Sequence, residues 1–326
     1  GSAIYSSDIR LPGMLYAAVR QSPFFGGKVS SFEKKTAMSQ KGVKAVITSN
    51  NGIAVVADST WNALKGIESL EVQFEGGKKH NLGTKSLDAL FSSNLEKMGK
   101  GQLQGEKTLD LEYEIQFLSH AAIEPMNCTA SVTNNKCEVW GPFQMQTLAL
   151  EKIKDITNLP EERIKVHTTY IGGGFGGKET QSNLFAVVAA LAAIRTGKSV
   201  KIRPDRDDDM IMTGKRHPFY IKYDVGFDKN GQIMAVDALL SANCGFSSDL
   251  SGPITDRALF HSDNCYFYPN VRLLSKPLKT NKVSNTAFRG FGGPQGMMLA
   301  ERIIQEIAYF LMKDPLEIKK INLYKT

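Results

Sequence analysis

Apolar residues near the N-terminus come in short runs that predict a hairpin, a helix and a returning strand. β-Branched runs at residues 44–49 and 53–58 flank an Asn-Asn-Gly turn at 50–52, which is typical of a β-hairpin. Ser59 can cap the helix that follows, and the chain then returns as a strand. We therefore predict a small α/β domain over residues 1–75.

The pattern changes over residues 76–107, where Gly, Lys, Ser and Asn recur and apolar periodicity is weak. Such a stretch is typical of a long polar surface connection. One short helix is predicted within it, around residues 87–98. The domain boundary is expected here.

From residue 108 to residue 326 the apolar pattern is denser and indicates a larger domain. Strands are predicted at residues 109–117, 137–140, 164–171, 219–227 and 232–240, and helices at 145–157, 179–196 and 297–312. Strands and helices mix without strict alternation, which favours the α+β class over a doubly wound sheet.

The composition is ordinary for a globular protein, with 42% hydrophobic and 22% charged residues. The longest unbroken apolar run, residues 184–194, is shorter than the ~20 residues that a spanning helix needs, and the first residues lack the features of a signal peptide. The formal net charge is +7, but Lys and Arg are spread along the chain. This spread favours a solvated surface or an anionic ligand, so we expect no nucleic-acid partner. The short apolar run predicts no membrane span.

The four cysteines do not form a metal-binding or disulfide pattern. Cys128, Cys137, Cys244 and Cys265 contain no CxxC pair and no histidine at zinc spacing. We expect mostly buried thiols in a reducing compartment.

The strongest chemical signal is a glycine-rich loop at residues 171–179, Ile-Gly-Gly-Gly-Phe-Gly-Gly-Lys-Glu. The glycines remove side chains that would keep the backbone from a ligand, and the predicted helix that follows would attract anions. Gly172, Gly174 and Gly177 satisfy the GxGxxG pattern of dinucleotide sites, although Phe175 would crowd a pyrophosphate. Three interpretations stay open: a tight turn, a nicotinamide or flavin site, and a cradle for another anionic or oxo group.

A second loop of the same character spans residues 285–296, Asn-Thr-Ala-Phe-Arg-Gly-Phe-Gly-Gly-Pro-Gln-Gly. It also precedes a long predicted helix, and it offers Arg289 and two aromatic rings that could stack on a flat heterocycle. Phe288 fits a core position as well as a pocket position, whereas Phe291, bracketed by glycines, favours exposure to a pocket. Two such loops in one chain suggest a shared ligand.

Other polar residues favour structural roles. His120 and Glu124 have helical spacing, but Pro125 predicts a loop, and two ligands do not make a metal site. His167 alternates with apolar neighbours in a predicted strand. The acidic run at residues 205–209 favours a loop network with neighbouring arginines over a cation site.

The two glycine-rich loops closely resemble those of the molybdenum-binding subunit of the xanthine dehydrogenase and aldehyde oxidase family. The same likeness extends to the motifs Asp-Arg-Asp-Asp-Asp-Met at 205–210, Gly-Lys-Arg-His-Pro-Phe at 214–219, Arg-Ala-Leu-Phe-His at 257–261 and Lys-Thr-Asn at 279–281. From about residue 164 onward the chain is xanthine dehydrogenase-like. Upstream, the segments at 11–16, 24–29 and 120–130 resemble the isoquinoline 1-oxidoreductase β-subunit branch instead.

The resemblance implies a fold and a cofactor. Residues 1–75 would form a hammerhead-like domain, and residues 108–326 the first half of a molybdopterin-binding α+β domain, truncated before its C-terminal half. The expected cofactor is a molybdenum-pyranopterin, in the cytosine dinucleotide form if the source is bacterial.

The resemblance also implies which residues surround the cofactor. Gln144 matches the family's glutamine beside the metal's oxo group. Gly174, Phe175 and Gly176 match the loop whose amides face the metal centre. Arg289 matches the arginine whose main chain faces it from the other side. Gln144, Phe175 and Arg289 would thus surround molybdenum without ligating it, because amide dipoles suit an electron-rich oxo or sulfido group.

Glu179, Arg257 and Phe291 match the residues that handle substrate in the purine-oxidising branch. A carboxylate and a guanidinium on opposite sides of a flat ring would hold its N–H and carbonyl edges. This polar pair favours a purine such as hypoxanthine or xanthine; an N-heterocycle of the isoquinoline type or an aldehyde is the alternative. Without the family, Glu179 would be interpreted as a helix N-terminal carboxylate and Arg257 as an ordinary surface ion pair.

The rest of the protein has its own expected roles. In the family, hydroxylation uses oxygen from water, and the glutamate that acts as general base lies in the C-terminal half. Residues 1–326 are therefore expected to hold no catalytic residue and to be inactive alone. Expected partners are the C-terminal half, 2Fe–2S and FAD subunits or domains, and a small heterocyclic substrate. The expected compartment is the cytoplasm, or the periplasm if the isoquinoline-type likeness dominates.

Two functions of other classes stay open. The chain could be a non-catalytic fragment that binds cofactor or partner subunits. It could also be a nucleotide-binding dehydrogenase, as the GxGxxG pattern allows.

Overall fold

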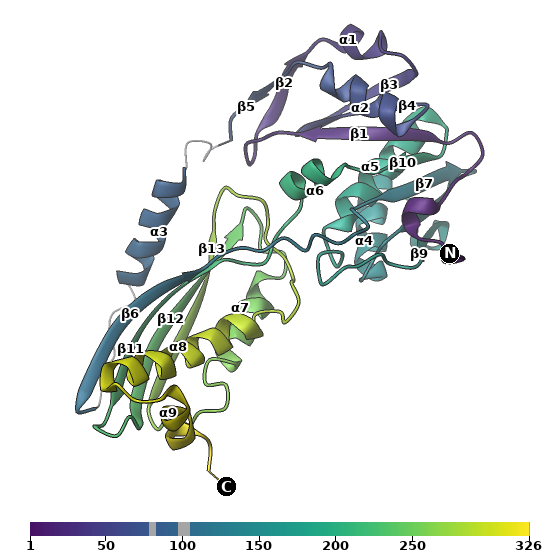
Figure 1. Cartoon of the computed structure of the whole chain (residues 1–326). Coiled ribbons are helices and arrows are strands. Elements are labelled where there is room, and N and C mark those ends of the chain that lie inside the picture. The colour runs from purple at the N-terminus through teal and green to yellow at the C-terminus, as the bar shows by residue number, and fades with distance from the viewer. Residues whose placement is uncertain (78–82, 97–104, 326) are drawn as a thin grey trace. The chain divides into compact units, whose positions relative to one another are not determined.

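The computed structural model describes residues 1–77, 83–96 and 105–325 (Figure 1). Contacts group the chain into two compact units, which we call unit 1 (residues 1–81 and 119–214) and unit 2 (residues 82–118 and 215–326). Residues 119–214 therefore group with the N-terminal part of the chain. The predicted division into domains at residues 76–107 stays a prediction, and part of that stretch lies outside the described residues.

Unit 1 is built on a seven-stranded sheet with the order β3-β4-β1-β10-β7-β8-β9. Its strands are β1 (Leu15–Gln21), β3 (Val43–Ser49), β4 (Gly52–Ala57), β7 (Cys128–Thr133), β8 (Lys136–Gly141), β9 (Ile164–Thr168) and β10 (Val200–Ile202). The predicted hairpin of β3 and β4 is confirmed. Pairing of β1 with β10 was not predicted, and it joins the N-terminal strands to the later ones.

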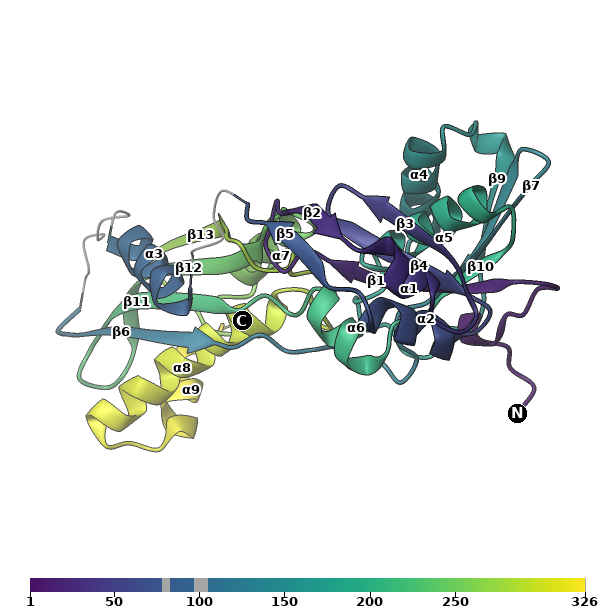
Figure 2. The ribbon, with the colours of Figure 1, turned by 90° about the horizontal axis from the view of Figure 1, so that it is seen from above.

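A two-stranded sheet and several helices complete unit 1. They are η1 (Ser6–Asp8), β2 (Lys28–Phe32), α1 (Lys34–Met38), α2 (Thr60–Glu68), β5 (Val72–Glu75), α4 (Gln146–Thr157), η2 (Glu161–Arg163), α5 (Ser182–Thr196) and α6 (Arg206–Met212). Figure 2 shows α4 and α5 together beside β7, β9 and β10. The alanine-rich α5 is buried there with Phe143 and Phe185.

Local signals set the ends of several helices. The Ser59 side chain accepts a hydrogen bond from the Asn62 amide, which confirms the predicted cap of α2. Asn158 and Gly197 end α4 and α5 in the left-handed conformation. Residues 205–209 were predicted as a loop but begin a helix: Asp205 caps α6 by accepting from the Asp208 amide, because acidic side chains suit a helix N-terminus. The predicted contact with a neighbouring arginine is present, as an ion pair of Arg206 with Asp209 at 3.2 Å.

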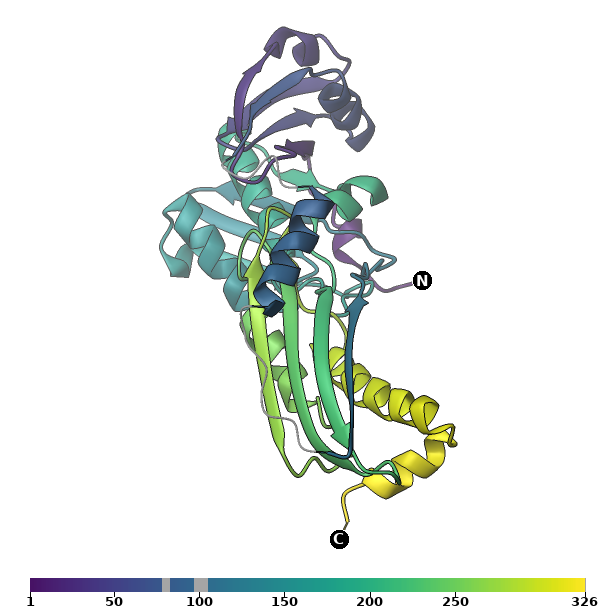
Figure 3. The ribbon, with the colours of Figure 1, turned by 90° about the vertical axis from the view of Figure 1, so that its left-hand side faces the viewer.

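Unit 2 is a four-stranded sheet with helices on both faces. Its elements are α3 (Thr84–Glu96), β6 (Lys107–Ile115), β11 (Phe219–Phe227), β12 (Ile233–Gly245), α7 (Ser251–Phe260), β13 (Val271–Lys279), α8 (Gly293–Leu311) and α9 (Pro315–Asn322). The strand order is β13-β12-β11-β6. Alternate residues of β11 pack with α7 and α8 in one core. Helix α3 lies along the opposite face of the sheet (Figure 3), where the ring of Phe91 stacks on that of Tyr220 with centroids 4.1 Å apart.

This mixture of helices and strands confirms the α+β class. Cys128, Cys137 and Cys244 are buried and Cys265 is exposed, as expected for mostly buried thiols. Within the described ranges, no helix is both long and apolar enough to cross a membrane.

Candidate functional site

The first glycine-rich loop connects β9 to α5 in unit 1. Phe175, Gly173 and Gly176 all have positive φ angles, of 54°, 92° and 93°. The Gly177 amide donates to the Gly174 carbonyl at 2.8 Å and closes a turn. A phenylalanine in the left-handed region is strained, and such strain is found mostly at functional positions.

The predicted start of the following helix at Glu179 is wrong, because α5 begins at Ser182. The Lys178 carbonyl accepts from the Gln144 amide at 2.9 Å and from the Ser182 hydroxyl at 3.2 Å, instead of an amide of a first helical turn. The glycine amides therefore do not belong to the positive end of α5. Glu179 is also not the N-terminal carboxylate of that helix, whose cap is Gln181.

Gln144 holds the loop from the chain segment between β8 and α4. Its side-chain Oε1 accepts hydrogen bonds from the amides of Gly176 and Lys178, both at 3.1 Å. A Cβ on Gly174 would lie 2.6 Å from the same oxygen. The structure thus brings Gln144, Gly174, Phe175 and Gly176 together, as the resemblance implied, and the glutamine carbonyl is used to fix the loop.

The segment of residues 120–124 forms the floor of the loop. A Cβ on Gly172 would lie 2.4 Å from Glu124 Cβ, and one on Gly177 would lie 2.7 Å from the His120 ring. The Gly173 backbone lies against Ala122 in the same way. Four of the glycines therefore make room for neighbouring side chains. That they also open the backbone to a ligand stays a prediction.

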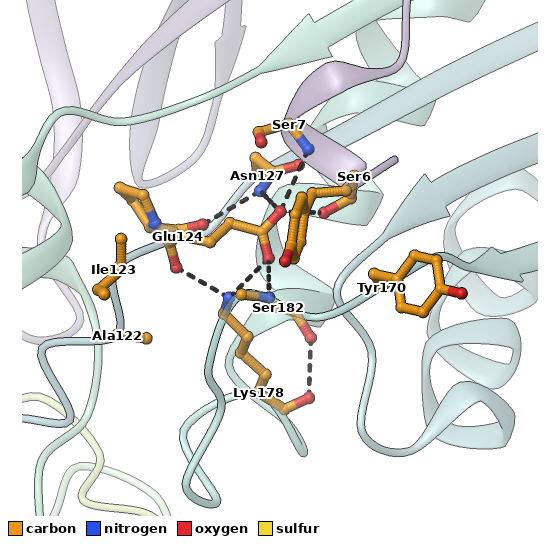
Figure 4. A network of polar contacts seen from close by, with 12 residues as sticks. Ser6, Ser7, Ala122, Ile123, Glu124, Asn127, Tyr170, Lys178 and Ser182 are labelled. Atoms are coloured by element: carbon orange, nitrogen blue, oxygen red, sulfur yellow. Dashed lines mark hydrogen bonds and ion pairs between the residues drawn. The ribbon is translucent and has the colours of Figure 1, made fainter. Parts of the chain in front are cut away.

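Glu124 and Lys178 form a buried ion pair that the sequence did not reveal (Figure 4). Burial acts to raise the pKa of the Glu124 carboxyl, but hydrogen bonds from Gly172, Ser6 and Lys178 outweigh it, and the pKa is lowered. Burial lowers the pKa of the Lys178 ammonium, against the opposing charge of Glu124. The predicted loop conformation around Pro125 is confirmed. Within it, Glu124 binds Lys178 and the Gly172 amide.

The top of the first loop presents unpaired amides. Across the described ranges of the chain, the N–H groups of Gly173, Gly174 and Phe175 have no acceptor. The Phe175 side chain is 49% exposed. Successive amide donors with positive φ nearby form a concave site that binds electron-rich groups.

The second glycine-rich loop lies in unit 2 between β13 and α8. The Phe291 amide donates to the Phe288 carbonyl at 2.7 Å, and Gly290 and Gly292 have φ angles of 94° and 95°. Arg289 is exposed. Its N–H and that of Gly290 lack an acceptor in the part of the chain that the structure describes.

The glycines of this second loop allow α8 to approach the backbone of α7. A Cβ on Gly292 would lie 2.1 Å from the Ile254 carbonyl oxygen, and one on Gly296 would lie 2.1 Å from that of Ala258. Arg257 is exposed on α7. Phe291, predicted to be exposed to a pocket, is half-buried and packs against the core of unit 2.

His217 anchors the second loop without charge. It is buried, its Nε2 lies 2.7 Å from the Ser251 hydroxyl, and its carbonyl accepts from Gln295 at 3.4 Å. Burial lowers the pKa of the imidazole to about 4. The residue is therefore neutral at pH 7.

His167, a further candidate, makes structural contacts. His167 stacks on Trp140 with ring centroids 4.8 Å apart and lies 2.9 Å from a Glu138 carboxylate oxygen. The described residues contain no group of three or more His, Cys, Asp or Glu side chains that could hold a metal ion.

A family model described as "Molybdopterin cofactor-binding domain" matches residues 92–323. This chain belongs to that family. It is 37% identical over 281 residues to a xanthine dehydrogenase/oxidase of Gallus gallus, covering 83% of this chain and 20% of that protein. The family resemblance stated from the sequence is thus confirmed, and the chain spans about a fifth of the length of this relative.

Solved structures share the fold. The aldehyde oxidoreductase of Desulfovibrio gigas superimposes with a TM-score of 0.82 at 22% identity, covering 99% of this chain and 42% of that one. The quinoline 2-oxidoreductase of Pseudomonas putida 86 gives a TM-score of 0.79 at 19% identity, covering 98% and 48%. The names of these two proteins refer to different substrates, so the shared fold does not select one.

Proposed function

We propose that this chain supplies glycine-loop contacts to the molybdopterin of a xanthine dehydrogenase-like hydroxylase. The observation that carries the proposal is the row of unpaired amides at Gly173, Gly174 and Phe175 on a loop pinned by Gln144. These donors fit the electron-rich oxo or sulfido groups of a molybdenum centre, which needs no protein ligand from this chain. When bound, that centre supplies the two-electron oxidation of a carbon–hydrogen bond with oxygen from water.

The residues of the two loops would act in different ways. Gln144 fixes the amides of Gly176 and Lys178, so that the unpaired amides of Gly174 and Phe175 lie on a turn held by hydrogen bonds. Arg289 would contribute its main-chain N–H from the second loop. Preorganised backbone donors of this kind stabilise developing negative charge without reorganising.

We further propose a purine such as hypoxanthine or xanthine as substrate, held by Glu179, Arg257 and Phe291. The support is the polar pair itself, since a guanidinium recognises a ring carbonyl and a carboxylate recognises a ring N–H. An N-heterocycle such as the quinoline named for the Pseudomonas enzyme, or an aldehyde, is the second candidate. The general base and the 2Fe–2S and FAD groups would belong to the rest of the enzyme. The cofactor would have the cytosine dinucleotide form if the source is bacterial. The enzyme would be cytoplasmic, or periplasmic if the isoquinoline-type likeness dominates.

Cofactor content of the full-length protein tests the first proposal. Molybdenum measured by elemental analysis and pterin released by acid should appear together, at about one per polypeptide. A folded full-length protein with neither would contradict the proposal. Cofactor without hydroxylation of purines, quinoline or aldehydes would favour the non-catalytic alternative, and binding of NADH to the described loop would favour a dehydrogenase.

The substrate proposal is tested by Arg257→Met in the loaded enzyme. Loss of one donor to a charge-bearing oxygen should lower kcat/KM for xanthine by about 10²–10³. Arg195→Met, another exposed arginine outside both loops, is the matched control and should leave kcat/KM unchanged. Equal rates for the Arg257→Met variant and the wild type would refute the role of Arg257.

A further inference from the structure

A single buried carboxylate, Glu124, ties both ends of the first loop together (Figure 4). Its Oε2 accepts from the Gly172 amide at 2.9 Å and from the Lys178 ammonium at 3.1 Å. Lys178 also donates to the Glu124 carbonyl at 2.8 Å. Gly172 and Lys178 bracket the unpaired amides, so one side chain closes the loop on itself.

Two further donors fasten the same carboxylate to the N-terminal segment. Oε1 accepts from the Ser6 hydroxyl at 2.7 Å and from the Ser7 amide at 3.2 Å, and Asn127 adds a third donor at 3.2 Å. All five groups that contact the two carboxylate oxygens are hydrogen-bond donors. A glutamine at position 124 would therefore place an NH2 group, which is also a donor, against Gly172 and Lys178 or against Ser6. The charged form of Glu124 is therefore built into the loop.

The burial of this pair favours a geometric role over a stabilising one. Lys178 is 2% exposed and Glu124 is 7% exposed. Removing two charges from water is unfavourable, and well-packed apolar side chains often give equal or greater stability. What apolar side chains cannot give is five directed hydrogen bonds to one carboxylate, two of which fix Gly172 and Lys178 relative to each other.

We infer that Glu124 and Lys178 are positioning residues that hold the amides of Gly173–Phe175 in the arrangement that receives the cofactor. This inference rests on the proposed function for its ligand, but the locking of the loop stands on the contacts alone. Neither side chain needs to touch the cofactor. Their effect would pass through the backbone of Gly172 and Lys178.

A second buried lysine of unit 1 provides the control. Lys201 is also buried, and its ammonium donates to the carbonyls of Ser7 at 2.8 Å and Ile9 at 2.5 Å. It contacts the same N-terminal segment but not the glycine loop. Lys201→Met therefore removes a comparable buried cation from the same unit without untying the loop.

The experiment compares Glu124→Gln, Lys178→Met and Lys201→Met in the full-length protein by amide hydrogen exchange and cofactor content. Loss of a charge-assisted hydrogen bond at the loop ends should speed exchange in the peptide covering residues 172–179 by about tenfold or more, relative to exchange in α5. Molybdopterin content should fall to a similar degree in the first two variants. Lys201→Met should leave loop exchange relative to α5, and the molybdopterin content, at the wild-type level.

A milder variant keeps the test decisive if Glu124→Gln or Lys178→Met does not fold. Ser6→Ala removes one donor and leaves the ion pair, and it should speed loop exchange by about threefold with α5 unchanged. Loop and α5 exchange rising in equal proportion in every Glu124, Lys178 or Ser6 variant that folds would overturn the inference, since the pair would then be only structural. A wild-type protein with a locked loop but no pterin would instead contradict the proposed function.

Discussion

The two glycine-rich loops look alike in sequence but are held by different forces. In the first, residues 172–178, the glycines make room for side chains, and polar groups of Gln144, Glu124 and Lys178 bind the backbone. In the second, Gly292 and Gly296 make room for carbonyl groups of helix α7, whereas Gly290 and Gly293 face the rings of Pro294 and His261. Side chains can move and backbone carbonyls cannot, so the two loops should respond differently to the same substitution.

The largest expected effect is at Gly296. In Gly296→Ala the new Cβ would lie 2.1 Å from the Ala258 carbonyl oxygen, a backbone atom held within helix α7. Helices α7 and α8 must separate, which should lower the free energy of unfolding of unit 2 by about 3 kcal/mol or more. Urea unfolding measures the loss. Gly252→Ala on α7, where a Cβ meets nothing within 4 Å, should change stability by less than about 1 kcal/mol, in the stabilising direction.

Acid should loosen the second loop before the first. The pKa of His217 is lowered to about 4 from an ordinary value of 6.5, so between these values the unfolded chain binds the proton and the folded chain does not. The stability of unit 2 should therefore be full above pH 6.5 and fall by up to about 3 kcal/mol as the pH drops to 4. The contribution of Glu124, whose pKa is lowered, is present above its ordinary value of 4.5 and is lost only below it.

Unfolding by urea at pH 7 and pH 5 measures this difference. His217→Gln should be less stable than the wild type at pH 7 but should lose less stability on acidification, because glutamine does not titrate. A wild-type protein whose unit 2 is equally stable at both pH values would contradict the buried neutral imidazole.

Local signals allowed much of the fold to be predicted from the sequence. The turn at 50–52, the Ser59 cap and the left-handed Gly197 each depend on a few neighbouring residues. The start of α5 was misplaced because the Lys178 carbonyl is bound by Gln144, far away in the chain. Long-range pairing of this kind leaves no periodic pattern.

The candidate site was predicted in part for the same reason. The resemblance identified Gln144 and the loop around Phe175, and the structure brings them together. The ion pair of Glu124 with Lys178 was missed because the two residues are 54 positions apart in the chain, although Lys178 lies in the glycine-rich loop itself. The burial of these two charges can be predicted only when the loop glycines are recognised as positions that pack against residues 120–124.

The smallest effect sharpens the comparison most, because it concerns a clash that can be relieved. In Gly174→Ala the Cβ would lie 2.6 Å from Gln144 Oε1, at the end of a flexible side chain, and Gly174 has no positive φ that would strain alanine. The side chain should swing away and release the amides of Gly176 and Lys178, at a cost of about 1 kcal/mol. Gln144→Ala releases the same two amides, so the double variant should be no less stable than either single variant, a coupling of about 1 kcal/mol. Additive losses in urea unfolding would mean that Gly174 is constrained by something other than Gln144, and that the first loop is as rigid toward a new Cβ as the second.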